Sequence, residues 1–221
     1  MADPTTTIHP HPYYPTTLSL PTYAPIPYPP IVLMSFVAIP SLLAASIGYY
    51  VISALNPSST RAQRVTTLWF LFSGLIHTNF EGYWLRHHEA LVGSSDVRAV
   101  MWREYAKSDS RYLTSDGFIL GVEKLTVYGI GPLCLAVYIA SCFNFSWNHP
   151  LRIFVSGMHV FSVSLYLVTA GFEHTRPEPQ YFWGYFVAMN VFWLIVPAVL
   201  AWQSSAKLMK AEEAAGERKR Q

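Results

Sequence analysis

Ile31–Leu55 is a run of about 25 residues without a charged side chain, and it directly follows Pro29 and Pro30. A helix of this length, rising about 1.5 Å per residue, crosses a hydrocarbon core of about 30 Å. Further apolar stretches occur at residues 66–85, 118–143, 151–172 and 181–202. Only 13% of the residues are charged, against about 25% in soluble domains. The sequence therefore predicts an all-α membrane protein with five transmembrane helices.

The predicted spans form one domain over residues 31–203, and the two flanking segments differ from it in composition. Residues 1–30 are rich in Pro, Tyr and Thr and contain no Lys or Arg, so they lack the basic start of a conventional signal peptide. Residues 204–221 form a charged tail. Lys and Arg are in slight excess on the side of the membrane that holds this tail, which favours a cytoplasmic C-terminus.

Three ionisable side chains, His77, Glu81 and Glu123, fall within the predicted spans. Such groups are costly at membrane depth unless they face a protected cavity, and they are typical of functional sites. His77 and Glu81 are four residues apart, so they share one helix face and are positioned to exchange a proton. The alternative is that these groups only join helices by hydrogen bonds, but that role does not require a titratable carboxyl. We therefore expect the helices to enclose a polar, proton-handling ligand cavity.

Other polar and aromatic side chains are candidates for the wall of this cavity. Trp102, Tyr105 and Tyr112 lie in the long connection between the second and third spans, which is predicted to be either a lid over the cavity or a solvated interfacial helix. The candidates within the spans are Thr126, His159, Tyr166, Asn190 and Trp193. We expect these residues to contact the substrate.

Composition and spacing argue against several other classes of site. The only basic cluster is Arg218–Arg220 in the tail, so nucleic acid is not an expected partner. Cys134 and Cys142 lie in one predicted helix without metal-ligand spacing. His77 and Glu81 are at ligand spacing, but the second histidine of the usual metalloprotease signature is absent. The sequence predicts neither a metal site nor a cofactor.

Several motifs, in order along most of the chain, resemble those of the emopamil-binding protein family, the sterol Delta8-Delta7 isomerases. They are HPHPYYP at residues 9–15, GLIHTNFEG at 74–82, WREYAKSDSRY at 102–112, EKLT at 123–126, GPL at 131–133, HPLR at 149–152 and YFWGYFVAMNVFWLIVP at 181–197. The resemblance implies a five-helix protein of the endoplasmic reticulum whose cavity holds a sterol. It also implies that the family's pocket residues correspond to His77, Glu81, Glu123, Thr126, Asn190 and Trp193.

The residue types suit the chemistry that this resemblance implies. Moving an alkene without a cofactor requires an acid to protonate one carbon, a tolerant environment for the cation and a base to remove a neighbouring proton. Two carboxyls and an imidazole are sufficient, although the sequence leaves open which glutamate donates. The ring of Trp193, with Tyr105 or Tyr185, can stabilise the cation. Such a site should also bind amphiphilic amines, which resemble the cationic intermediate.

The fourth predicted helix departs from the family pattern. His159, Val160, Phe161 and Ser162 stand where the sterol isomerases carry Gln-x-Tyr-Gly, so one wall of the cavity is expected to change while the acid–base groups remain. The substrate is accordingly left open between a sterol and a polycyclic terpenoid. A protein that only binds sterols or amphiphilic amines is the alternative from another functional class. Membrane lipid surrounds the chain in every case, and the oligomeric state is left open between monomer and homodimer.

Overall fold

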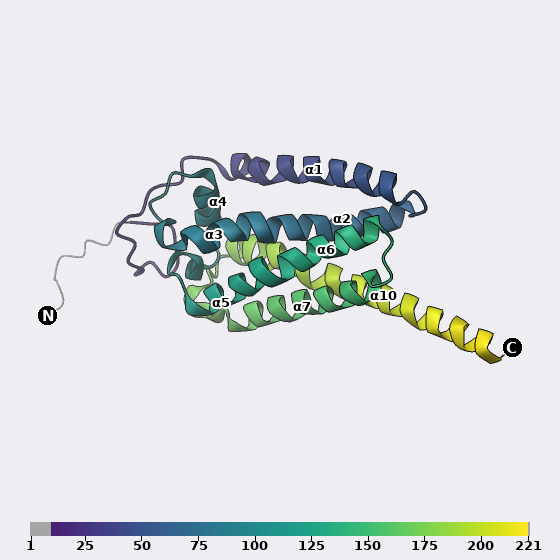
Figure 1. The fold of residues 1–221 in the computed structure, drawn as a ribbon. Helices are drawn as coiled ribbons and strands as arrows, with labels where there is room; N and C mark the ends of the chain where they lie inside the picture. The colour runs from purple at the N-terminus through teal and green to yellow at the C-terminus, as the bar shows by residue number, and fades with distance from the viewer. Residues whose placement is uncertain (1–9, 221) are drawn as a thin grey trace.

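The structure, a computed structural model, describes residues 10–220, apart from the side chain of Phe172. His9 of the HPHPYYP motif and Gln221 of the tail lie outside the described residues. Residues 10–220 contain helices and no β-strand, so the all-α prediction is confirmed for this part of the chain. The helices run side by side in an elongated bundle (Figure 1).

Five helical rods make up the bundle, and three of them contain a segment of π-helix. The rods are α1 (Pro30–Leu55); α2 (Arg61–Leu75) with η1 (Ile76–Glu81) and α3 (Gly82–His87); α5 (Gly117–Leu125) with η4 (Thr126–Ile130) and α6 (Gly131–Cys142); α7 (Asn148–Thr169); and α9 (Pro179–Tyr181) with η5 (Phe182–Val187) and α10 (Ala188–Arg220). Short elements connect them: η2 (His88–Ala90), α4 (Val97–Tyr105), η3 (Ser110–Leu113) and α8 (Gly171–His174).

Within the described residues, four of these rods are long and apolar enough to cross a membrane. They cover Pro30–Leu55, Gly117–Cys142, Asn148–Thr169 and Pro179–Arg220. The rod at residues 61–87 is not among them, and it carries the polar side chains of His77, Asn79 and Glu81. The second predicted span, at residues 66–85, therefore stays a prediction.

The rods begin where the sequence offers helix-starting groups. Pro30 occupies the first position of α1, where its missing N–H costs nothing. Thr60 and Gln63 form a capping box at the start of α2. The carboxylate of Asp116 accepts from the backbone N–H groups of Phe118 and Ile119 at the start of α5. The caps at Thr60 and Asp116 fix where the two rods begin that contain His77 and Glu123.

The packing separates an inner group of helices from α1. α10 packs along α7, α2 packs against α6, and α1 contacts mainly α2 at one edge of the bundle (Figure 1). Many large apolar side chains of α1, such as Ile31 and Leu42, are exposed, as expected for a helix in lipid. α10 continues beyond the bundle through Arg220 (Figure 1), so most of the charged tail is helical.

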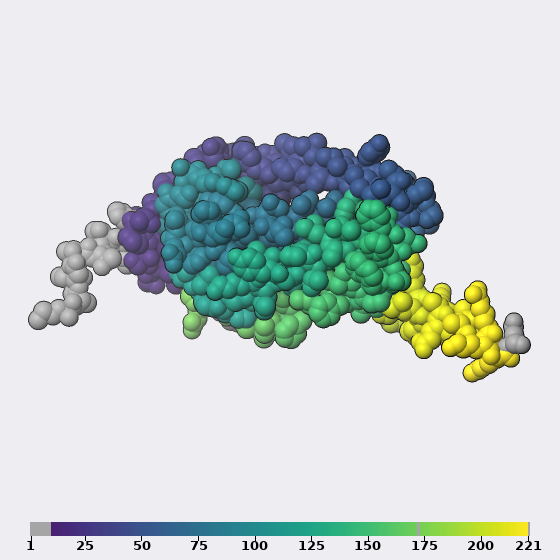
Figure 2. Space-filling model, viewed as in Figure 1, coloured from purple at the N-terminus to yellow at the C-terminus, as the bar shows by residue number. Residues whose placement is uncertain are grey.

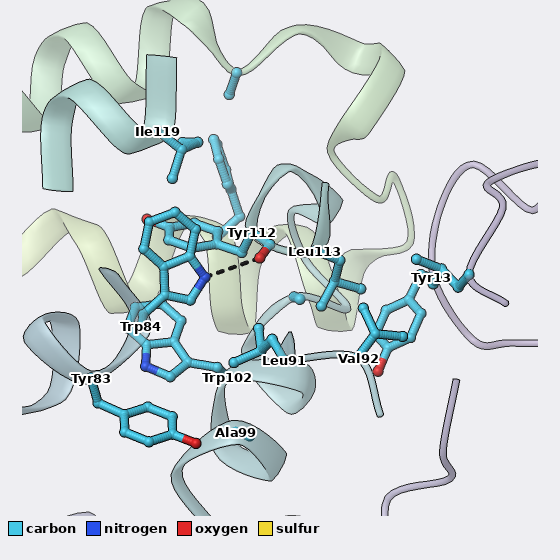
Figure 3. Close-up of a cluster of buried hydrophobic side chains, with 14 of the residues drawn as sticks. Tyr13, Tyr83, Trp84, Leu91, Val92, Ala99, Trp102, Tyr112, Leu113 and Ile119 are labelled. Carbon is cyan, nitrogen blue, oxygen red and sulfur yellow. Dashed lines mark hydrogen bonds between the residues drawn. The ribbon is translucent and has the colours of Figure 1, made fainter. Parts of the chain in front are cut away.

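The connection between the second and third rods closes one end of the bundle with aromatic side chains. Trp102 and Tyr112 are buried and stack with ring centroids 5.0 Å apart. The indole N–H of Trp84 donates to the backbone oxygen of Tyr112 at 3.0 Å, as Figure 3 shows. Burial of these rings within the protein contradicts the solvated alternative for this connection, and the lid over the cavity stays a prediction.

Candidate active site

A histidine pair joins η1 to α7 in the middle of the bundle. Nδ1 of His77 lies 2.8 Å from Oε2 of Glu81, so the four-residue spacing does bring these groups together. Nε2 of His77 lies 2.9 Å from Nε2 of His159. Both imidazoles are buried. Because two neutral rings can share a hydrogen bond only when one nitrogen donates and the other accepts, their tautomers are linked.

Glu123 extends this chain of polar groups toward the aromatic end of the bundle. Its carboxyl group neighbours that of Glu81, and its Oε2 has no hydrogen-bond partner in the described part of the chain. The hydroxyl of Tyr112 donates to Oε1 of Glu123 at 3.1 Å, and Glu123 is buried. Hydrogen bonds thus link His159, His77 and Glu81 in one group and Tyr112 and Glu123 in another, and the two carboxyls lie next to each other.

Each of three candidate positions lies in or next to a π-helical segment. η1 contains His77 and Glu81, η4 starts three residues after Glu123, and η5 ends shortly before Asn190. A π-helical turn widens the helix and is often found at functional sites. Hydrophobic periodicity gave no signal for these segments, because one wide turn leaves the apolar pattern of a long helix almost unchanged.

A close approach of two rods holds His77 in place. A Cβ atom built on Gly131, at the start of α6, would lie 2.9 Å from Cγ2 of Thr78 and 3.0 Å from Cβ of His77. Any larger residue would therefore push η1 away from α6. Glycine at this position allows the backbone that carries His77 to pack directly against the rod that carries Glu123.

A second polar network lies beside the first, and most of it comes from the connecting segment. Nδ2 of Asn190 donates to the hydroxyl of Tyr105 at 3.1 Å, and that hydroxyl lies 3.4 Å from the hydroxyl of Tyr166. Tyr166 donates in turn to Oδ2 of Asp109 at 2.9 Å. Burial raises the pKa of Tyr105 to about 12, so its hydroxyl keeps its proton. The network fixes these rings against Tyr112.

Sequence reasoning missed the residues that anchor this second network. Asp109 is fully buried and pairs with Arg111 at 2.6 Å, within the segment WREYAKSDSRY. The alternation of charged and aromatic residues in that segment was the available signal. Cys134 is buried, with its Sγ 3.9 Å from Nε2 of His159. Within residues 10–220 no group of three His, Cys, Asp or Glu side chains is arranged to hold a metal ion.

The remaining candidates differ in how close they lie to the acid–base groups. The ring of Trp193 lies 6.4 Å from that of His77 and packs on Trp69 at 5.4 Å. Thr126 is buried, but its hydroxyl donates to the Val122 carbonyl of its own helix. Phe161 is 68% exposed on the outer face of α7, so the expectation that it forms part of the cavity wall is wrong. It lies two residues after His159, which turns it to the other side of the helix.

A groove of about 470 Å³ lies on the other side of the second rod, between α1 and α2. Apolar residues including Phe36, Leu71 and Phe80 line most of it, with Asn79 and Arg86 among the polar ones. Figure 2 shows the hollow beneath α1. No candidate site residue lines this groove. The predicted ligand cavity around the two glutamates therefore stays a prediction.

Comparison with known proteins places this geometry in a family. A model of the EXPERA (expanded EBP superfamily) domain matches residues 97–204. The 3-beta-hydroxysteroid-Delta(8),Delta(7)-isomerase of Rattus norvegicus is 34% identical over 214 residues, which cover 91% of this chain and 90% of the relative. The chain belongs to the EBP family. The family resemblance predicted from the sequence motifs is confirmed.

The EBP-family relatives of this chain carry names of two kinds. The Arabidopsis thaliana protein named a probable 3-beta-hydroxysteroid-Delta(8),Delta(7)-isomerase is 28% identical over 204 residues, covering 91% of this chain and 90% of the relative. Isomeliandiol synthase of Melia azedarach is 33% identical over 153 residues, covering 68% of this chain and 72% of the relative. The family thus includes enzymes named for steroids and an enzyme named for a plant product.

Proposed function

We propose that this EBP-family protein is a membrane-embedded isomerase that shifts a ring double bond of a sterol or a polycyclic terpenoid. The observation that carries the proposal is the hydrogen bond between His77 and Glu81, with the carboxyl of Glu123 beside them. These groups can move a proton without a cofactor. The names of the relatives, steroid Delta(8),Delta(7)-isomerases and isomeliandiol synthase, support this substrate class.

The proposed reaction transfers one proton onto the substrate and removes another. A carboxylic acid of the Glu81–Glu123 pair protonates one alkene carbon, and the electron pair of the double bond forms the new C–H bond. The neighbouring carbon becomes a cation. A carboxylate of the pair then takes a proton from the next carbon, and the electrons of that C–H bond form the shifted alkene. The pair ends with the same number of protons, so no oxidant or reductant is needed.

The tautomers of the two histidines can change with the protonation state of Glu81. When Glu81 is protonated, it donates to Nδ1 of His77, and Nε2–H of His77 donates to Nε2 of His159. When Glu81 is a carboxylate, Nδ1–H of His77 donates to it, and Nε2 of His77 accepts from His159. Both states satisfy the observed distances of 2.8 Å and 2.9 Å. We infer that His159 is a positioning residue that keeps both tautomers of His77 accessible.

The carbocation requires a site that stabilises positive charge. Trp193 lies next to His77 in a cluster with Trp69 and Phe72, and an indole face attracts a desolvated cation by about 2 kcal/mol or more. The carboxylate of the pair adds to this attraction. Amphiphilic amines, which place a positive charge on an apolar body, are therefore proposed as competitive inhibitors.

The apolar rods support a membrane setting for this protein. We propose that the chain spans the endoplasmic reticulum membrane five times, with residues 31–203 as the isomerase domain and residues 66–85 as the second span. The charged tail then lies in the cytoplasm, as the excess of basic residues on that side favours. The bundle contains all three acid–base groups, so the proposed chemistry does not require a homodimer.

Deuterium transfer tests the proposal directly. Membranes containing the protein are incubated in heavy water with a Delta8 sterol and, separately, with a panel of polycyclic terpenoids. A shifted alkene carrying one deuterium at the protonated carbon is expected for at least one substrate class. The preferred class then identifies the substrate. Binding of both classes without any shifted alkene would instead support a protein that only binds these ligands.

A further inference from the structure

A buried arginine without an acidic partner lies at the end of the bundle where α2 begins and α6 ends (Figure 1). Arg152 of α7 is only 7% exposed. Its Nε donates to Oδ1 of Asn148 at 3.0 Å, and its Nη2 donates to the hydroxyls of Thr67 at 2.6 Å and Ser141 at 2.8 Å. All three acceptors are neutral. Across residues 10–220, no carboxylate forms an ion pair with this guanidinium.

The guanidinium lines a small polar cavity of about 130 Å³. His149 and Lys207 also line it, with serine, threonine, glutamine and asparagine side chains and a single apolar residue, Ile52. Within the described part of the chain, no Asp or Glu contributes to its wall. Nη1 of Arg152 forms no hydrogen bond to another described residue. The cavity therefore gathers positive charge and hydrogen-bond donors around one point.

The start of α7 adds to this positive potential. α7 is a 22-residue helix that begins at Asn148, and Asn148 and His149 both line the cavity. Among the first groups of α7, the N–H of Asn148 donates to the Phe145 carbonyl and Pro150 has no N–H, so the N–H of His149 is the one that adds partial positive charge for an anion. The helix start and the buried arginine are independent features, and both act on the same cavity.

An uncompensated buried charge is costly, and a bound anion removes that cost. We propose that this cavity binds a phosphate group, supplied by the headgroup of an anionic lipid or by a free phosphate. Arg152 and Lys207 would pair with the phosphate, while Thr67 and Ser141 hold the guanidinium in place. Ser141 lies 18 residues after Glu123 along the same helical rod, which separates the two sites by about 27 Å. The proposal therefore does not depend on the isomerase chemistry.

Thermal unfolding of the full-length protein tests this proposal in two arms. In neutral detergent, Tm is measured with inorganic phosphate or with chloride at equal ionic strength. In phosphatidylcholine nanodiscs, Tm is measured with and without phosphatidylserine. Because a ligand that binds only the folded state raises Tm with its concentration, at least one arm should show a rise. A rise with inorganic phosphate identifies a free phosphate as a sufficient ligand, and a rise with phosphatidylserine alone identifies a lipid headgroup.

The variants assign the effect to this cavity. Lys207→Gln, at an exposed position, should weaken binding about fivefold, which corresponds to about 1 kcal/mol, and Lys207→Glu should abolish the rise in Tm. Arg152→Gln should also abolish it, and the Lys207 variants keep the test valid if Arg152→Gln does not fold. Lys210→Gln is the matched control, because Lys210 is exposed on the same helix but does not line the cavity. A flat Tm in both arms, or equal weakening by Lys207→Gln and Lys210→Gln, would overturn the proposal.

Discussion

His77 and His159 share a hydrogen bond between their Nε2 atoms at 2.9 Å, which joins η1 to α7 across the bundle. His159 stands at the position where the sequence departs from the expected family pattern. The residue that departs from the pattern, His159, is thus the hydrogen-bond partner of His77, a proposed acid–base group. Phe161 and Ser162, the neighbouring departures, do not make this contact, because Phe161 faces outward and the hydroxyl of Ser162 donates to the His159 carbonyl.

Replacing His159 tests this relationship. His159→Phe keeps a ring but removes both nitrogens, so His77 loses its partner, and kcat should fall about tenfold, which corresponds to about 1.4 kcal/mol. His159→Gln keeps a donor and an acceptor and should retain most of the activity. The measurement is isomerase turnover with the preferred substrate, with KM determined in parallel. Equal kcat for wild type and His159→Phe would show that His77 does not need this partner.

The carboxyl pair should be essential for turnover. Glu81→Gln and Glu123→Gln keep the shape of each side chain but remove its acid–base chemistry, so kcat should fall by about 100-fold to 10,000-fold. Glu89→Gln serves as the control, because Glu89 is exposed in η2. Deuterium incorporation from heavy water provides the readout. Wild-type incorporation by both pair variants would eliminate the proposed mechanism.

The hydroxyl of Tyr112 should contribute through its bond to Glu123. Tyr112→Phe keeps the buried ring and its stacking on Trp102, so the fold should be retained. The loss of a hydrogen bond to a charged group costs about 1.5–3 kcal/mol, and kcat should fall by at least about tenfold. Tyr128→Phe, at an exposed position in η4, is the control. Unchanged turnover by Tyr112→Phe would assign this residue a packing role only.

The close approach at Gly131 should be sensitive to a single methyl group. Gly131→Ala places a Cβ at 2.9 Å from Thr78 and 3.0 Å from Cβ of His77, so η1 must shift. A displacement of about 1 Å in a reacting group can lower a rate about 100-fold. Gly129→Ala is the matched control in the same rod, because its added Cβ would meet no described atom within 4 Å beyond its chain neighbours and the backbone of its own helix. Turnover and Tm of both variants are compared, and equal values for the two would contradict this account.

Trp193 should control the affinity for cations. Trp193→Leu keeps an apolar side chain but removes the indole face, so the inhibition constant of an amphiphilic amine should rise by about tenfold or more, given an interaction of about 2 kcal/mol. A neutral analogue of the same shape should lose little affinity. The comparison uses competitive inhibition of turnover. If the variant weakens both compounds equally, Trp193 provides apolar contact rather than charge stabilisation.

The sequence by itself determined the helical class and the four strongly apolar rods, and it named the proposed acid–base groups. Apolar runs in lipid have few alternatives to a helix, and the four-residue spacing of His77 and Glu81 fixes a common face in any ordinary helix. The family motifs also could be read directly, since they depend on local residue order. The predicted second span, at residues 66–85, is less apolar because it contains the polar side chains of His77, Asn79 and Glu81.

Only the tertiary structure decided which groups meet between helices. The contacts of His77 with His159 and of Glu123 with Tyr112 join residues that are 82 and 11 positions apart. No periodic pattern encodes such distances, because they depend on how the rods rotate and on where π-helical turns change their register. The burial of Asp109 and Arg152 also could not be predicted from the sequence, because a charged side chain enters the interior only when several elements supply its partners.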